Sequence, residues 1–425
     1  MNFDMQVYIA TFIFISTYFL IVSEKINRTS AALLGACMML GLKIISQEYA
    51  FDSIDFNTIG LLIGMMIIVT ITKKTGVFQY IAIKSAKLAK GDPWRIILLF
   101  SIITAISSAL LDNVTTVLLI APVTLVITDT LKVNPLPFLI PEILAANIGG
   151  SATLIGDPPN IMIGSATKLG FVDFVLNLAP IVIVIFIITL FILKLVYKRQ
   201  LKVKESLRQK ILSFNENKSI QNVLLLKKSL FVLALTIVGF TLHQFVHLES
   251  ATIALIGASI LLVISKLDPE EILFEIEWTT IFFFAGLFVL VGGLEKVGII
   301  DSIAEHLVLL TKGNLMLTAL IVLWVSAIAS AFIDNIPFVA TMIPLIKSIG
   351  AMSSLNITPL WWALALGACL GGNGSLVGAS ANVIVAGFLE KTESRLSFIE
   401  FLKIGFPIMI ISIILSTIYL LLFYV

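Results

Sequence analysis

The segments SALLDNVTTVLLIAP (residues 108–122) and NIGGSATLIGDPPN (residues 147–160) decide the fold of this chain. Both place carboxylate, amide, glycine and proline residues between long apolar runs. A helix in apolar surroundings avoids such residues, because they introduce polar groups or interrupt the backbone hydrogen bonds. Polar breaks inside apolar sequence are typical of the binding sites of membrane transporters.

Both segments occur a second time, at positions 222 residues later (108 becomes 330). The second copies are SAFIDNIPFVATMIP (residues 330–344) and GGNGSLVGASAN (residues 371–382). The offset holds without a gap from Ala32/Ala254 to Asn160/Asn382, and it aligns Gly, Pro, Asp, Asn and Lys as well as apolar residues. Chance similarity between apolar sequences does not align these residue types, so the sequence indicates an internal duplication.

The composition places the chain in a membrane. Of its 425 residues 59% are hydrophobic and only 13% are charged, and the mean hydropathy is +1.07. A soluble protein carries about 25% charged residues. We therefore expect a multi-pass protein of the cell membrane with the lipid bilayer as its surroundings. The net charge of +2 comes with no basic face, which argues against a nucleic-acid partner.

Apolar runs of about 20 residues predict five crossings in each copy. The expected fold class is an all-α polytopic membrane protein of two inverted repeats, residues 1–197 and 229–425, because an odd number of crossings turns the second copy over. Each repeat is expected to hold a re-entrant helical hairpin and a broken helix. The hairpins are predicted at 95–131 and 316–347, and the broken helices at 137–167 and 359–389.

A basic linker, residues 198–228, joins the two copies. Short loops rich in Lys and Arg stay in the cytoplasm, so the linker is expected inside and both termini outside. Its basic residues are Lys198, Arg199, Lys202, Lys204, Arg208, Lys210, Lys218, Lys227 and Lys228.

Asp112 and Asp334 lie at the two predicted hairpin tips. A charged residue at the bilayer centre costs about 2.5–3.5 kcal/mol even on insertion scales, so we interpret both as cation- or proton-binding residues. The alternative is a helix cap, which explains the following Asn113 and Asn335 well. Asp157 has no acidic counterpart, since Ala379 stands at the matching position, and it is a candidate for coupling, with a plain helix N-cap as the alternative.

The glycine-rich breaks are the second part of the predicted site. Glycine permits unusual dihedrals and close approach, and a broken helix offers free N–H and C=O groups to ions. The alternative is close helix packing by small residues. The full set of predicted substrate- or ion-binding residues is Asp112, Asn113, Thr115, Thr116, Asn147, Gly149, Gly150, Ser151, Thr153, Asp157, Asn160, Asp334, Asn335, Asn373, Gly374, Ser375, Ser380 and Asn382.

The sequence predicts no catalytic residues, metal site or cofactor apart from Na+ or H+ as a coupling ion. The two cysteines, Cys37 and Cys369, lie in apolar runs without metal-ligand spacing and are expected to be buried.

The four motifs resemble those of the ion-transporter superfamily, in the branch of arsenical pumps (ArsB), NhaD-type sodium/proton antiporters and the melanosomal P protein. The motifs are Asp112–Thr116, Ile155–Asn160, Ile333–Phe338 and Gly371–Asn382. The resemblance covers nearly the whole chain. It implies a homodimer and an elevator movement of the hairpin domain against a scaffold. The superfamily's sodium/dicarboxylate symporters carry Ser-Asn-Thr at the tips, where this chain has Asp-Asn, which argues against that activity.

Together these features predict a secondary transporter of a small inorganic ion or oxyanion rather than an enzyme. By resemblance, the expected activity is proton-coupled arsenite or antimonite efflux, and two cysteines exclude a trithiolate arsenic site. The alternatives are a Na+/H+ antiporter and an anion (dicarboxylate or chloride) transporter. From other classes, a channel and an intramembrane aspartyl enzyme stay open, although no Gly-x-Gly-Asp motif accompanies the aspartates.

Overall fold

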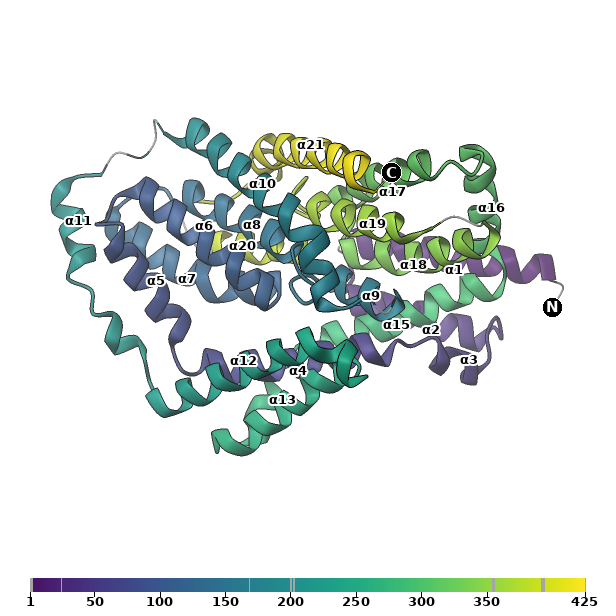
Figure 1. The fold of residues 1–425 in the computed structure, drawn as a ribbon, viewed down its shortest axis with the longest axis horizontal. Coiled ribbons are helices and arrows are strands. Elements are labelled where there is room, and N and C mark those ends of the chain that lie inside the picture. Colours follow the sequence, from purple (N-terminus) through teal and green to yellow (C-terminus); the bar gives the residue numbers. More distant parts are fainter. Residues whose placement is uncertain are drawn as a thin grey trace.

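The computed structural model describes residues 3–23, 25–167, 169–198, 201, 203–353, 356–390 and 394–424. All regular elements in these ranges are helices (Figure 1). The first repeat contains α1 Phe3–Ser23, α2 Arg28–Gly41, α3 Gln47–Asp52, α4 Phe56–Lys73, α5 Val77–Leu88, α6 Pro93–Leu110, α7 Asn113–Leu131, α8 Leu136–Gly150, α9 Pro158–Thr167 and α10 Phe171–Tyr197. The linker contains α11 Glu205–Leu212 and the 3-10 helix η1 Glu216–Ser219.

The second repeat has the same sequence of ten helices. They are α12 Val223–Val246, α13 Ser250–Ser265, α14 Pro269–Phe274, α15 Trp278–Lys296, α16 Ile299–Thr311, α17 Leu315–Phe332, α18 Asn335–Met352, α19 Thr358–Gly371, α20 Ser380–Glu390 and α21 Phe398–Phe423. The all-helical fold predicted from the sequence is therefore confirmed. The short helices α3 and α14 were not predicted, because their polar sequences look like loops.

Matching helices of the two repeats also make matching close contacts. In one crossing, a side chain on Gly64 of α4 would come within 2.7 Å of the backbone of Ala254 on α13. In the matching crossing, a side chain on Gly286 of α15 would come within 2.9 Å of the backbone of Ala32 on α2. The matching helices α5 and α16 lie at opposite ends of the molecule (Figure 1). The second repeat is thus inverted relative to the first.

The two hairpins are α6–α7 and α17–α18. Their arms have 18 and 19 residues in the first hairpin and 18 in each arm of the second. At about 1.5 Å per residue an arm is about 27 Å long, somewhat longer than the sequence suggested. Among the described residues, ten helices are long and apolar enough to cross a membrane, and these four arms are included. Each tip nevertheless lies beside a helix break, between α8 and α9 or between α19 and α20.

The linker is more ordered than the solvated loop that its composition predicts. Ile211 of α11 is fully buried in a hydrophobic cluster with residues of α7. Lys87 of α5 forms a 2.5 Å ion pair with Glu216 of η1, and this hydrogen-bonded ammonium lowers the pKa of the Glu216 carboxyl. The linker packs on the protein because α11 has an apolar side, which includes Ile211. Arg199 and Lys202 of the linker lie outside the described residues.

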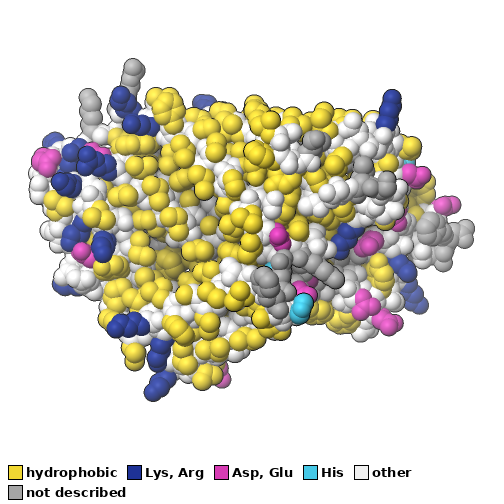
Figure 2. Space-filling view, in the orientation of Figure 1, with side chains coloured by type: hydrophobic (Ala, Val, Ile, Leu, Met, Phe, Trp, Pro, Cys, Tyr) yellow, Lys and Arg dark blue, Asp and Glu magenta, His cyan; other side chains and the backbone are white. Residues whose placement is uncertain are grey.

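Charged and hydrophobic side chains are distributed unevenly over the surface. Figure 2 shows hydrophobic side chains over the middle of the molecule and a gathering of Lys and Arg at the end where α5 and the linker lie. In Figure 1, both chain ends are displaced from that end toward the opposite one. A cytoplasmic linker with external termini stays a prediction from the distribution of Lys and Arg.

Gly149 allows α8 to pack directly on α6. A side chain there would overlap the backbone of Ala105. We expect Gly149→Ala to destabilise the protein by about 1–3 kcal/mol, because overpacking of a close contact forces the helices apart. Thermal unfolding in detergent measures the effect. Gly41→Ala is the matched control, since a side chain at Gly41 meets nothing within 4 Å. Equal melting temperatures of the two variants would contradict the expectation.

Candidate functional site

Matching hydroxyl groups attach each hairpin to the broken helix beside it. Ser108 of α6 donates a 2.6 Å hydrogen bond to the carbonyl of Ala146 on α8, and Ser330 of α17 donates a 2.6 Å bond to the carbonyl of Ala368 on α19. Ser330 is the repeat counterpart of Ser108. Each hairpin arm is thus fixed to the first half of its own broken helix just before the tip.

Asn147, near the end of α8, joins the two repeats. Its amide oxygen accepts a 3.1 Å hydrogen bond from Asn113 at the first hairpin tip. Its amide nitrogen donates to Asn373 at 3.0 Å and to Asn382 at 2.9 Å, both at the break of the second repeat. All four side chains are at most 3% exposed. A tip and two helix breaks therefore meet at one buried amide cluster.

Asp157 makes the second connection between the repeats. This carboxylate is 1% exposed and accepts hydrogen bonds of 3.3 and 3.4 Å from the amide of Asn335 at the second hairpin tip. It is within electrostatic range of both Asp112 and Asp334. The three aspartates predicted from the sequence are therefore brought into one region.

Helix capping accounts for the bond of Asp112 but for only part of the contacts of Asp334. Asp112 accepts a 2.7 Å bond from the backbone N–H of Thr115, and Asp334 accepts a 3.3 Å bond from that of Ile336. The second carboxylate oxygen of Asp334 has different partners. It forms an ion pair with Arg28 and accepts a 3.0 Å bond from the hydroxyl of Ser380.

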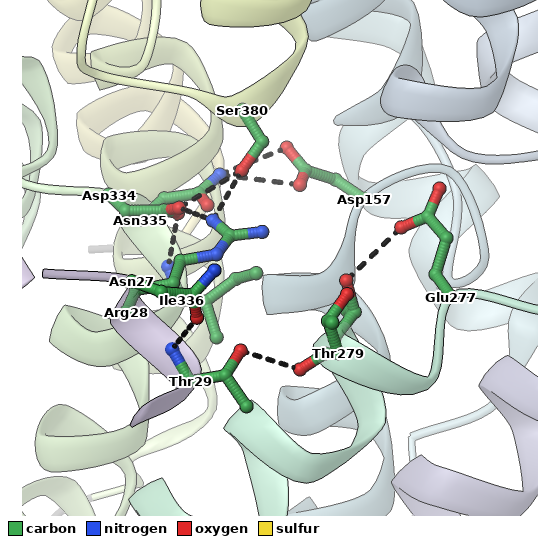
Figure 3. A network of polar contacts seen from close by, with 11 residues as sticks. Asn27, Arg28, Thr29, Asp157, Glu277, Thr279, Asp334, Asn335, Ile336 and Ser380 are labelled. Carbon is green, nitrogen blue, oxygen red and sulfur yellow. Dashed lines mark hydrogen bonds and ion pairs between the residues drawn. The ribbon is translucent and has the colours of Figure 1, made fainter. Parts of the chain in front are cut away.

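Arg28, at the start of α2, is the main residue that sequence reasoning missed, since it served there only to orient the chain. Figure 3 shows its guanidinium between Asp334 and Ser380, with Asp157 facing Asn335 nearby. Arg28, Asp334 and Ser380 border a cavity of about 330 Å³. Comparison of the two copies could have pointed to Arg28, because its counterpart is the uncharged Ser250 and only one copy has a cation at this position.

Several predicted ligands have local structural partners instead. The hydroxyls of Ser151, Thr153 and Ser375 each donate to a backbone carbonyl. The amides of Asn160 and Asn382 each donate to two carbonyls of their own break.

The glycines of the breaks act by close approach rather than by unusual dihedrals. None of Gly149, Gly150 and Gly374 has a positive φ. A side chain on Gly150 would overlap the carbonyl of Gly156, and one on Gly374 would come within 2.5 Å of Ala331. The close approach that was expected at these glycines is present, whereas a left-handed backbone is not.

Three buried groups have unused hydrogen-bonding capacity. The hydroxyl of Thr116, the amide nitrogen of Asn373 and one oxygen of Glu142 have no partner among the described residues. The other oxygen of Glu142 lies 2.6 Å from the hydroxyl of Thr124. Glu142 was not predicted as a site residue. Alignment of the two copies could have pointed to it, because the matching position of the second copy is the apolar Leu364.

The cysteines differ from each other. Cys369 is buried and donates a 3.5 Å hydrogen bond to Asn160. Cys37 is exposed, so the expectation that it is buried is wrong. The central site therefore contains a single thiol among its described residues.

Comparison with known families gives the class of the protein. The family model described as "CitMHS: Citrate transporter" matches residues 18–367. The chain belongs to this family. It is a membrane transporter of the ion-transporter superfamily and not an enzyme.

Relatives cover the whole chain. It is 45% identical over 418 residues to the "46 kDa membrane protein" of Mycobacterium leprae, covering 97% of both chains. It is 44% identical over 420 residues to an "uncharacterized transporter" of Mycobacterium tuberculosis, again covering 97% of both. The P protein of Homo sapiens is 36% identical over 502 residues, which span 98% of this chain and 60% of the relative.

The fold has a counterpart among solved structures. The YdaH transporter of Alcanivorax borkumensis, described as having an unusual topology, matches with a TM-score of 0.58 over 97% of both chains. The sequence identity is 12%, so this similarity concerns the fold alone.

Proposed function

We propose that this protein is a secondary active transporter that moves a small inorganic ion or oxyanion across the cell membrane, driven by the proton or sodium gradient. The observation that carries the proposal is the buried cluster around Asn147, which joins the tip of one repeat to the break of the other. Opposed, matching elements that meet at a buried polar centre suit alternating access better than an open pore.

The chemistry of the centre suits ion coupling. Asp112, Asp157 and Asp334 supply carboxylates, and such groups inside a membrane usually belong to ion or proton pathways. The amide nitrogen of Asn373 has no partner in the described part of the chain, and a buried donor without a partner costs about 1–3 kcal/mol. A substrate that accepts a hydrogen bond from this nitrogen would remove that cost.

The movement in this proposal is of the elevator type. The glycine–alanine crossings of α4 with α13 and of α2 with α15 form a rigid scaffold. The second hairpin touches it through few polar contacts, among them the ion pair to Arg28 and the 2.6 Å bond from Tyr18 to the carbonyl of Pro337. A homodimer, as the superfamily resemblance implies, completes the proposal, and a monomeric mass in detergent would count against it.

The first substrates to test are arsenite and antimonite, to which the resemblance with arsenical pumps points. With one thiol at the centre, carboxylate, hydroxyl and amide groups would have to bind them. Sodium/proton exchange, as in NhaD-type antiporters, is the second candidate, and the clustering of the three aspartates favours it.

Flux in proteoliposomes tests the proposal. The native chain and Asp112→Asn are compared under imposed proton or sodium gradients, with arsenite, antimonite, sodium and chloride as substrates. We expect gradient-driven accumulation of one of them, reduced at least about tenfold in Asp112→Asn, equivalent to ~1.4 kcal/mol in the barrier. Ohmic, uncoupled flux would favour a channel, and an unchanged rate in the variant would remove Asp112 from the mechanism.

A further inference from the structure

The ion pair of Arg28 has the composition of an anion site. The guanidinium lies on the edge of the 330 Å³ cavity and is 2.7 Å from the hydroxyl of Ser380. It also lies over the ring of Phe283 on α15, with 5.1 Å from its central carbon to the ring centre. A guanidinium with a neighbouring hydroxyl is a preferred donor set for carboxylates and other oxyanions.

In this structure the carboxylate of Asp334 accepts the hydrogen bonds that these donors offer. One oxygen of Asp334 accepts from both Arg28 and Ser380. The symmetry-related arrangement is absent, because Ser250 of the second repeat and Pro158 of the first stand at the positions that match Arg28 and Ser380. The arrangement is therefore not a by-product of the duplicated fold.

The ion pair also connects two parts of the molecule. Arg28 belongs to the start of α2 in the scaffold, whereas Asp334 is the tip of the hairpin α17–α18. Its side chain is 13% exposed and that of Arg28 is 32% exposed. The pair is thus reachable from the cavity, and any movement of the hairpin against the scaffold has to break it.

We propose that Arg28 binds a small substrate anion in place of Asp334, and that Asp334 takes up one proton when it is displaced. This inference rests on the proposed function and specifies its substrate class and coupling. The carboxylate of Asp334 gains a proton, and the anion takes over the neutralisation of Arg28. One proton and one negative charge bind together, so the step is electroneutral.

The surrounding charges favour this exchange. Asp157, from the break after α8, is within electrostatic range of Asp334, and Glu277, at the start of α15, is within range of Arg28. If Asp334 left Arg28 as a carboxylate, it would face Asp157 without its counter-ion. Protonation removes this repulsion, whereas a neutral substrate would leave Arg28 unpaired.

Calorimetric binding to the purified full-length protein in detergent tests the proposal. The probes are chloride, phosphate and citrate as sodium-free salts, at pH 5.5 and 7.5, in buffers of different ionisation enthalpy. For the native chain we expect at least one probe to bind more tightly at pH 5.5, with an uptake of about one proton. Asp334→Asn should bind that probe without proton uptake and with the same affinity at both pH values.

Variants of Arg28 complete the design. Arg28→Gln should weaken binding at least tenfold, and Arg28→Lys should retain part of it. Lys25→Gln, a nearby exposed cation, is the matched control and should bind like the native chain. Native affinity in Arg28→Gln, or unchanged proton uptake in Asp334→Asn, would overturn the proposal.

The calorimetric and flux results separate the two proposals. Coupled transport of sodium or arsenite without binding of any of the three anions would refute the anion site and leave the transporter proposal intact. Proton-linked anion binding without coupled flux of any substrate would support the anion site and refute the transporter proposal.

Discussion

Replacing Asp157 by Asn is expected to abolish gradient-driven transport while leaving the protein folded. The asparagine oxygen can still accept the hydrogen bond that Asn335 donates to Asp157, and the change removes a buried charge, so stability should not fall. What is lost is an ionisable group that bonds to the hairpin tip of the opposite repeat. We expect coupled flux in proteoliposomes to fall at least about tenfold, equivalent to ~1.4 kcal/mol in the barrier.

Two measurements accompany this prediction. The melting temperature of Asp157→Asn in detergent should equal or exceed that of the native chain. Asp173→Asn serves as a matched control, because Asp173 caps α10 on its first turn and lies outside the central cluster. Coupled flux at the native rate in a well-folded Asp157→Asn protein would exclude Asp157 as a coupling group.

Replacing Asn147 by Ala is expected to impair both folding and transport. The change leaves the amide nitrogen of Asn113 and the amide oxygen of Asn373 without the partner they have now. Each buried group without a partner costs about 1–3 kcal/mol. We therefore expect a loss of about 2–5 kcal/mol in stability, measured by thermal unfolding, and a loss of coupled flux in the protein that still folds.

Cys369→Ala is the comparison for this prediction, because Cys369 occupies the position that matches Asn147 in the second repeat. Its thiol is a weak donor and lies 3.5 Å from the amide oxygen of Asn160, so its removal should cost far less than that of Asn147. Similar losses in the two variants would show that Asn147 fills space rather than joining the repeats.

The helices and breaks were largely predictable from the sequence. Asp112-Asn113 and Asp334-Asn335 marked the hairpin tips, whereas Pro122 and Pro344 lie inside the continuous helices α7 and α18. The predicted end of the first repeat, at residue 197, coincides with the end of α10, Phe171–Tyr197. Because the sequence is duplicated, each helix and break could be predicted twice, once from each copy.

Long-range partners were not predictable in the same way. Arg28 and Asp334 are 306 positions apart, and an arginine after a first span looks like an ordinary orientation signal. Hydroxyls near a break, such as Thr153 and Ser375, resemble ligands in sequence, yet a neighbouring helix supplies carbonyls that they satisfy first. Comparison of the two copies could have identified them, since the positions that match Arg28 and Glu142 carry no charge.

The crossings at Gly64 with Ala254 and at Gly286 with Ala32 have a consequence for biogenesis. In each crossing, one helix comes from the first half of the chain and the other from the second. While the ribosome is still synthesising the second half, α2 and α4 are already in the lipid without these neighbours. The two crossings can therefore close only after α13 and α15 have entered the membrane.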